Sequence, residues 1–527
     1  MSIEGVLVSY NYSSDEEPAK ILTVAASGIK FSERWVLTHG SIIAPLKVAE
    51  TIEKSKGKVI NDEFYANLPE IYVTCERKPS EAIYEEVKQL SKERAPVDQN
   101  QVDLDHPSYF MRILTGRICH IWECSLIEKC VSAIMYSWAV GLNQGTVEQQ
   151  SSLGKTLLPL FVLIDLETDH RGYKVLRPLS ALLDMVSPPP NRGSRLVVHS
   201  TPFGCEAFLN TESQGAVSSL VGPRPSLLLT DAPTAMGSEG GPVFNDEANL
   251  IGMVICSVSW WCGEWVGLSL VAPLASVLTA KLHVDPPKSP SPELRRQPSV
   301  LLKSIDNSTV LVQCGASWGS GVYLGRGYIL TCAHVVRNYE LYKVSIYCQR
   351  QQEVAIVRYK STEQRAYDLA LLFTDPRRWA RLEPAVLAKT PAVKGEPVLA
   401  AGFTYFKVND IEDLLPIVTS GHVSNVSPSL LQTTCCIQSG FSGGPILRVI
   451  DQRVEVVGII TSNAKTTDGA THTHINMSIP INLFCEELYQ YQEDKVHYRP
   501  FQGMQHSCSR GEPRYWSSDM LLYRPTF

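Results

Sequence analysis

Short apolar segments alternate with turn-forming residues along much of the chain, most clearly in its second half. The segments are rich in β-branched and aromatic residues, and Gly, Asp and Ser separate them. Short strands at close spacing are typical of all-β barrels and sandwiches. We therefore predict an all-β fold, closed by a short helix at 486–492. The predicted strands of the second half are 310–314, 321–324, 328–331, 353–359, 369–373, 398–401 and 454–460.

A proline-rich, charged stretch interrupts this pattern at residues 284–300 and offers little to bury, which predicts a domain linker. A chain of 527 residues also exceeds the ~250–300 residues that a single core usually holds. We therefore expect an N-terminal domain at 1–283 and a C-terminal domain at 301–490. Beyond residue 490 the composition becomes polar and basic, which predicts a poorly ordered tail at 491–527.

Composition and charge exclude several classes of protein. The chain carries 48 basic and 54 acidic side chains, a net charge of −6, which gives no electrostatic footprint for nucleic acid. No segment approaches the ~18 apolar residues of a membrane span, and the N-terminus lacks the pattern of a secretory signal. The 14 cysteines do not form the paired Cys-x-x-Cys motifs of zinc sites. We expect free, buried thiols in a reducing compartment, including the loose cluster Cys119, Cys124 and Cys130.

Three motifs of the C-terminal part carry the residue types of a serine nucleophile site. They are Thr-Cys-Ala-His with His334, Tyr-Asp-Leu-Ala with Asp368, and Gly-Phe-Ser-Gly-Gly-Pro with Ser442. The chemistry needs a hydroxyl nucleophile, an imidazole to take its proton and a carboxylate to orient the imidazole. Glycines around the serine allow a tight turn whose amides point at an oxyanion. The order His, Asp, Ser on an all-β background therefore predicts a catalytic triad.

Residues 301–490 resemble a trypsin-like serine protease of the HtrA/Deg type, which has a double β-barrel fold. Besides the triad motifs, the string Thr-Ser-Gly-His-Val-Ser at 419–424 supports the resemblance. By this resemblance His334 is the general base, Asp368 its orienting carboxylate and Ser442 the nucleophile. The backbone amides of Gly440 and Ser442 would form the oxyanion hole. The mechanism requires no metal and no cofactor.

The resemblance also implies a primary specificity pocket between the residues before the nucleophile and the strand at 458–463. Cys436 and Gly458 are its candidate residues. A cysteine at that position would make the pocket small and uncharged. The alternative, that Cys436 is simply part of the core, stays open.

The N-terminal part repeats these patterns in degraded form. Ser27 and Thr38 are eleven positions apart, as are Ser320 and Thr331. The string at 213–218 matches 419–424, and Gly-Ser-Glu-Gly-Gly-Pro at 237–242 matches the motif of the nucleophile. The N-terminal half is therefore interpreted as a protease-like domain without activity, with an insertion near 77–154.

In this alignment Ser41 stands at the position of His334. Asp165 can be aligned with Asp368, and Glu239 stands at the position of Ser442. A rival interpretation makes His39 and Ser238 catalytic. We disfavour this interpretation, because His39 and Ser238 are shifted by one or two residues from the positions of His334 and Ser442, and such a shift points a side chain in another direction.

An inactive protease-like half before an active one resembles the peroxisomal trypsin-domain processing proteases, known in plants as glyoxysomal Deg proteases. The resemblance implies a serine endopeptidase that removes N-terminal leader peptides from peroxisomal matrix enzyme precursors, processes some of them internally and cleaves itself. We expect self-cleavage within 77–154. Peroxisomal precursors are the expected partners, and self-association is left open.

Peroxisomal location follows from the resemblance, although the chain ends in Pro-Thr-Phe rather than in a Ser-Lys-Leu-type signal. Two alternatives to leader-peptide processing remain. One is a general quality-control protease of the HtrA kind. The other is a catalytically silent, protease-like scaffold.

Overall fold

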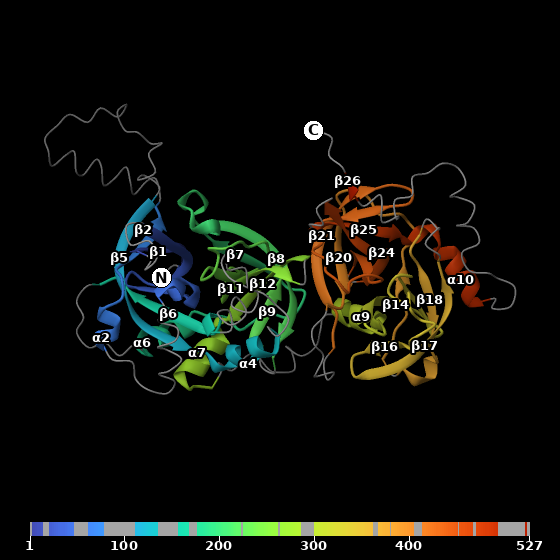
Figure 1. Ribbon diagram of the computed structural model, residues 1–527, viewed down its shortest axis with the longest axis horizontal. Coiled ribbons are helices and arrows are strands. Elements are labelled where there is room, and N and C mark those ends of the chain that lie inside the picture. Colours follow the sequence, from blue (N-terminus) through green and yellow to red (C-terminus); the bar gives the residue numbers. More distant parts are fainter. Residues whose placement is uncertain are drawn as a thin grey trace, which may run out of the picture.

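The computed structural model shows two similar halves side by side, blue to green and yellow to red (Figure 1). We call them the N-terminal unit, up to residue 285, and the C-terminal unit, from residue 300. The described residues are 3–13, 21–46, 62–77, 111–134, 156–167, 176–222, 225–261, 264–285, 300–361, 367–379, 381–404, 414–451, 453–466, 471–493 and 522–523.

The N-terminal unit consists of two closed six-stranded barrels. The strands of the first, in their order around the barrel, are β1 (Glu4–Ser13), β2 (Ile21–Lys30), β3 (Trp35–His39), β6 (Leu160–Asp165), β5 (Met111–Glu123) and β4 (Ile71–Glu76). Those of the second are β10 (Pro242–Asn245), β11 (Leu250–Trp261), β12 (Glu264–Pro273), β9 (Leu227–Thr230), β8 (Thr211–Val221) and β7 (Arg195–Ser200). The helices are η1 (Gly40–Leu46), α2 (Asp62–Ala66), α4 (Ser125–Ile134), α6 (Leu176–Leu183), η3 (Pro202–Gly204), η4 (Glu206–Phe208) and α7 (Leu274–Leu282).

The C-terminal unit repeats this architecture, so the predicted all-β fold of two tandem double-barrel units is confirmed. Its first barrel has the strands β13 (Thr309–Cys314), β14 (Ser317–Gly325), β15 (Tyr328–Thr331), β18 (Ala370–Phe373), β17 (Gln351–Lys360) and β16 (Val344–Cys348). Its second has β24 (Arg453–Thr466), β23 (Pro445–Ile450), β20 (Pro397–Gly402), β21 (Ile417–Val426), β22 (Leu431–Thr433) and β25 (Thr471–Pro480), and the pairing of β24 with β25 closes it. The remaining elements are β19 (Val386–Leu387), β26 (Leu522–Tyr523), α9 (Val300–Ser308), η5 (Pro376–Arg378), η7 (Ile481–Leu483) and α10 (Cys485–Glu493).

Period-two burial explains why these segments form barrel strands. In β16, Val344, Ile346 and Cys348 are buried and the residues between them are only partly so. One face of such a strand packs into the barrel interior and the other faces outward. Strands that pack on both faces have no alternation, as in β6, which is buried throughout. None of the helices in the described ranges is long and apolar enough to cross a membrane.

One expectation about the N-terminal domain needs correction. The stretch 77–154, expected to be an insertion without a counterpart, contains β5, which lies between β4 and β6 as β17 lies between β16 and β18. Only residues 77 and 111–134 of this stretch are described, so most of the expected self-cleavage region lies outside the described residues. The same holds for most of the expected linker at 284–300 and of the expected tail at 491–527.

The two units meet where β8 of the first lies beside β21 of the second (Figure 1). Asp231 bridges them, since its carboxylate accepts hydrogen bonds from the Ala216 amide at 2.6 Å and from the Ser420 amide at 2.5 Å. Arg192 makes a second bridge: it donates to the Pro416 carbonyl at 2.6 Å and pairs with Asp306. These charged groups are buried, so the contact between the units is specific rather than a loose juxtaposition.

Replacing Asp306 by alanine should destabilise the protein by about 3–5 kcal/mol, because the buried Arg192 guanidinium loses its anionic partner. Chemical denaturation would measure the loss. Arg377→Ala is the matched control, since this arginine pairs with Asp375 at an exposed site. Equal stabilities of the two variants would contradict the importance of the buried pair.

Candidate active site

His334 and Asp368 come together because β15 and β18 pair with Thr331 opposite Ala370. His334 follows the end of β15, and Asp368 precedes the start of β18. The backbone amide of His334 donates to Asp368 Oδ1 at 3.0 Å, and its ring Nδ1 makes a short contact with Oδ2 of the same carboxylate. The carboxylate therefore fixes both the position of the backbone and the orientation of the imidazole.

Ser442 lies in the turn before β23, between two glycines with positive φ. Gly440 has φ of 97° and Gly443 has φ of 86°, values that side-chain-bearing residues rarely adopt. The turn also leaves no room, since a Cβ on Gly440 would lie 2.0 Å from the Phe403 carbonyl oxygen. The Ser442 hydroxyl donates to the Thr461 carbonyl at 3.0 Å, so here it is held by β24 rather than by the imidazole.

The amides of Gly440 and Ser442 donate no hydrogen bond to another residue in the described part of the chain. Both belong to the turn that carries Ser442, the expected nucleophile, and donors of an oxyanion hole must lie close to the nucleophile. Phe441 between them is fully buried and packs against Gly402, which anchors the turn from behind. The turn thus offers two amides on a rigid support.

Ser320 on β14 connects this turn to the first barrel. Its hydroxyl donates to the Gly440 carbonyl at 2.7 Å and accepts from the Phe403 amide at 2.9 Å. Its amide donates to the Ser442 carbonyl at 2.8 Å, and its carbonyl accepts from the Thr331 hydroxyl at 2.7 Å. The eleven-residue spacing of Ser320 and Thr331 had marked this serine as a repeated feature. The sequence did not reveal that its hydroxyl and amide bind the turn that carries Ser442.

The N-terminal unit repeats three of these four hydrogen bonds. The Ser27 hydroxyl donates to the Gly237 carbonyl at 2.7 Å and accepts from the Thr201 amide at 2.8 Å, and the Thr38 hydroxyl donates to the Ser27 carbonyl at 2.6 Å. Gly237 has φ of 90°, close to that of Gly440. The framework of the active-site turn is therefore present in both units.

The chemistry is absent from the N-terminal turn, because Glu239 stands where Ser442 stands in the second unit. Its carboxylate accepts a hydrogen bond from the Gly237 amide at 2.8 Å, the counterpart of the Gly440 amide. Burial raises the pKa of Glu239, and hydrogen bonds from its own amide, Gly237 and Ser257 oppose that rise. The carboxylate thus interacts with both amides that correspond to the oxyanion hole.

Asp165 does not take the place of Asp368, contrary to the sequence alignment. The residue opposite the threonine of the Ser–Thr pair is Val162 in the first unit and Ala370 in the second. Asp368 lies two residues before Ala370, so Leu160 is its counterpart. The equal sequence offsets that suggested one continuous register were coincidental.

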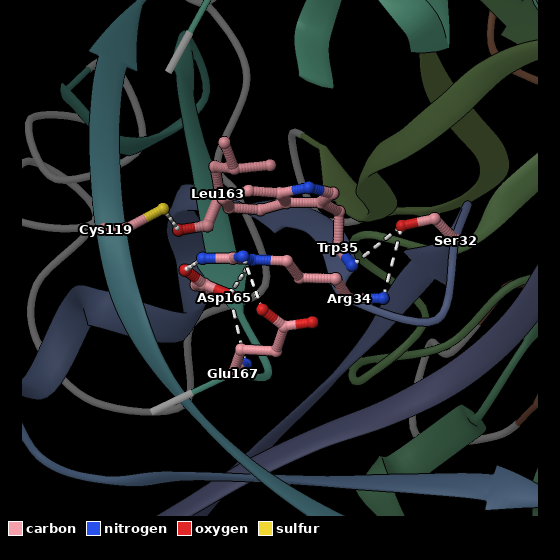
Figure 2. A network of polar contacts seen from close by, with 7 residues as sticks. All are labelled: Ser32, Arg34, Trp35, Cys119, Leu163, Asp165 and Glu167. Carbon is pink, nitrogen blue, oxygen red and sulfur yellow. Dashed lines mark hydrogen bonds and ion pairs between the residues drawn. The ribbon is translucent and has the colours of Figure 1, made fainter. Parts of the chain in front are cut away.

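Asp165 lies at the other end of β6 and forms a structural ion pair there (Figure 2). Arg34 donates to its two carboxylate oxygens at 2.7 Å each, and Glu167 also pairs with Arg34. The Ser32 hydroxyl accepts hydrogen bonds from the amides of Arg34 and Trp35 in the same turn. The Asp165 carboxylate therefore has a structural role: it binds Arg34 and stabilises the turn before β3.

The rival pair His39 and Ser238 is not assembled either. The His39 ring is buried, with Nε2 bonded to the Leu158 carbonyl at 3.2 Å and Nδ1 accepting from the Ser41 amide at 3.2 Å. Burial lowers the pKa of His39 to about 4. Ser238 is also buried, and its hydroxyl accepts from the Ala235 amide.

The two candidate pocket residues have different surroundings. Cys436 is fully buried in the hydrophobic core, which favours the alternative that it is a core residue. The next residue, Ile437, accepts a hydrogen bond from the Asn463 side chain at 3.0 Å, which joins the two segments expected to form the pocket walls. Gly458 lies further back in β24 and faces Leu431 and Ile479. The structure therefore brings Cys436 and Asn463 to the same region and leaves Gly458 outside it.

Cys332, His334 and Asp368 are the one described group of side chains close enough to share a metal ion, with ligand atoms within 4.8 Å of one another. Each atom already has a partner, since the imidazole and the carboxylate contact each other and the Cys332 thiol donates to the Ile460 carbonyl at 3.2 Å. Burial, together with the Asp368 charge, raises the pKa of Cys332. All cysteines in the described ranges are free thiols.

The double-barrel fold of the two units is trypsin-like. The family Trypsin-like peptidase domain matches the chain at residues 141–253 and 319–459, one region in each unit.

Among individual proteins, the chain is similar to the peroxisomal leader peptide-processing proteases of mouse, at 34% identity over 330 residues, and human, at 35% over 332 residues. Each alignment covers 57% of this chain and 56% of the relative, so the chain spans about half the length of the curated relatives it matches. A solved serine endoprotease from Yersinia pestis aligns with a TM-score of 0.30 and 24% identity, over 38% of this chain and 69% of that one.

Ser320→Ala and Ser27→Ala form a matched pair of variants. Each removes the same hydrogen bonds and should cost about 1–3 kcal/mol of stability. Only Ser320→Ala should slow labelling of Ser442 by a fluorophosphonate, by roughly 100-fold, because only that turn carries the expected nucleophile. Equal labelling rates in both variants would show that Ser320 does not position the site.

The buried His39 should make stability depend on pH. Its pKa of about 4 in the folded protein lies below the ~6.5 of an unfolded chain, so the unfolded state binds more protons between these values. Stability should therefore fall by roughly 3 kcal/mol as pH drops from about 6.5 to 4. In His39→Gln, the free energy of unfolding, measured by denaturation at several pH values, should lose this part of its pH dependence. His120→Gln should remove a comparable part, since burial also lowers the pKa of His120 to about 4. Unchanged slopes would contradict the assignment.

Proposed function

We propose that this protein is a serine endopeptidase with the triad Ser442, His334 and Asp368, and that it removes leader peptides from peroxisomal precursor proteins. The observation that carries the proposal is the oriented His334–Asp368 pair beside a turn whose amides at Gly440 and Ser442 donate to no other residue in the described part of the chain. The names of the mouse and human relatives support the substrate class. Peroxisomal location and self-cleavage are parts of the same proposal.

In this mechanism the Ser442 hydroxyl first rotates from the Thr461 carbonyl to the imidazole of His334. The imidazole takes its proton as the oxygen attacks the scissile carbonyl, while Asp368 holds Nδ1–H and stabilises the imidazolium. The oxyanion accepts hydrogen bonds from the amides of Gly440 and Ser442, each worth about 2.7–4 kcal/mol in such sites. His334 then protonates the leaving amine, and water hydrolyses the acyl-enzyme by the reverse sequence.

The N-terminal unit, residues 1–283 in this proposal, contributes no second active site. Ser41, Leu160 and Glu239 stand at the places of the base, the aspartate and the nucleophile, and none of them can perform those roles. The protease domain is then 301–490, which contains the whole triad.

Labelling with a fluorophosphonate probe tests the proposed nucleophile directly. The unaltered protein and Glu239→Ala should label, whereas Ser442→Ala should not, because the probe bonds only to an activated serine. Labelling of Ser442→Ala would refute the assignment of the site. A failure of every form to label would favour the silent scaffold.

Cleavage patterns separate leader-peptide processing from general quality control. A single cut that releases the leader from a precursor is expected here. Ragged degradation of unfolded chains, with folded precursors left intact, would favour the quality-control alternative.

A further inference from the structure

An exposed pair of phenylalanines lies on the loop that follows β7 in the N-terminal unit. Phe203 belongs to η3 and Phe208 to η4, and their side chains are 67% and 46% exposed. The two rings meet edge to face, with their centroids 5.9 Å apart. Met236 is 39% exposed, and its carbonyl accepts a hydrogen bond from the Phe203 amide at 2.5 Å. These three residues, which we call the aromatic patch, expose apolar surface in one place, and such clusters mark binding surfaces.

The backbone of Phe203 adopts a conformation that side-chain-bearing residues rarely take. Its φ is 61° and its ψ is 8°. The loop is packed tightly from below, because a Cβ on Gly204 would lie 2.6 Å from the Ala25 Cβ of β2. An exposed ring gains little from burial that would offset this strain. Strained residues of this kind cluster at sites that bind ligands.

The aromatic patch adjoins the turn of the N-terminal unit that corresponds to the active-site turn. The Thr201 amide donates to the Ser27 hydroxyl, as the Phe403 amide donates to Ser320 in the protease domain. The loop that follows Thr201 therefore runs beside the turn of Glu239. Within that turn, a Cβ on Gly237 would lie 2.4 Å from the Gly204 amide nitrogen.

Exposed acidic residues flank the aromatic patch. Glu206 lies between the two phenylalanines in the sequence, and Glu212 begins the strand that follows them. Glu76 is nearby, since it accepts a hydrogen bond at 2.9 Å from the side chain of Asn210. Within the described residues none of these glutamates pairs with a lysine or arginine, and the cationic neighbour of Glu212 is His199, at 4.0 Å. The surroundings of the patch therefore attract basic groups.

The spacing of the two rings suits an extended peptide. Side chains on one face of an extended chain are about 6.7 Å apart, close to the separation of the ring centroids. Aromatic side chains are also the commonest anchors of binding interfaces. A bound segment would thus place two apolar side chains on the rings and basic side chains near the glutamates.

We propose that the aromatic patch binds the leader peptide of a precursor protein, as an extended segment that carries apolar and basic side chains. The catalytically silent unit then selects the substrate that the protease domain cuts. The identity of the bound segment rests on the proposed function. The binding surface itself contains no residue of the proposed triad, so the two can be tested separately.

The exposed thiol of Cys205, between the two phenylalanines, provides a direct test of binding. The full chain with Ser442→Ala is treated with iodoacetamide, and mass spectrometry of its peptides gives the alkylation rate of Cys205. A precursor that carries its leader should slow this rate by about fivefold or more at several times its Kd, because the bound segment covers the thiol. The same precursor without its leader should not slow it.

Phe203→Gly and Phe208→Ser should abolish this protection. In the background with an intact Ser442, they should raise KM for the precursor by about tenfold and leave kcat unchanged, because they remove binding remote from the cut. Glycine tolerates the φ of Phe203, so the loop keeps its course. Cleavage of a short peptide around the cut should not change. Ile356→Ser is the matched control, since this residue of β17 is 58% exposed in the protease domain.

The charge of the bound segment has its own test. Glu206→Gln should raise KM for the precursor by about two- to threefold at low salt and should weaken the dependence of KM on salt. An unchanged salt dependence would overturn the basic character assigned to the segment.

Unchanged alkylation of Cys205 in the presence of the precursor, with Ser442 of the unaltered protein still labelled by a fluorophosphonate, would overturn this inference and leave the proposed function standing. Protection by the precursor without its leader would overturn it too. Protection that depended on the concentration of the protease alone would assign the patch to contacts between two copies of this chain, against the inference. If the unaltered protein did not label, the proposed function would fail, whereas protection of Cys205 would still decide whether the patch binds the leader.

Discussion

The proposed triad spans two barrels, so its geometry depends on what holds those barrels together at the site. His334 and Asp368 come from the first barrel of the C-terminal unit and Ser442 from the second. Ser320 connects them, with its hydroxyl and amide bonded to the turn of the nucleophile and its carbonyl bonded to Thr331 beside the base. Catalytic groups need placement within about half an ångström, and four hydrogen bonds through one buried residue supply that constraint.

Parts of this arrangement could be predicted from the sequence because they are local. The spacing of Ser320 and Thr331 reflects neighbouring strands, and the Gly-x-Ser-Gly-Gly-Pro string encodes a turn that only glycines can form. The alignment of Glu239 with Ser442 succeeded for the same reason. These features need no knowledge of where distant segments lie.

Other parts depended on distant pairings and could not be predicted. Asp165 was misplaced because loop lengths differ between the copies, and only the pairing of β3 with β6 shows that Leu160 stands at the place of Asp368. The strand β5 was missed because its burial is irregular and it lies in a long stretch with no recognisable motif. The hydrogen bond from the Cys436 thiol to the Gly267 carbonyl joins residues 169 positions apart, and nothing in either local sequence indicates it.

The carboxylate of Glu239 does more than remove the serine from the N-terminal turn, because it also occupies the amides of that turn. Because it is attached to the chain beside the amides that it contacts, it behaves as a tethered competitor whose effective concentration does not depend on dilution. Any carbonyl group that approached those amides from solution would have to displace it. An acyl ligand would therefore occupy the turn only at concentrations above the effective concentration of this tethered carboxylate.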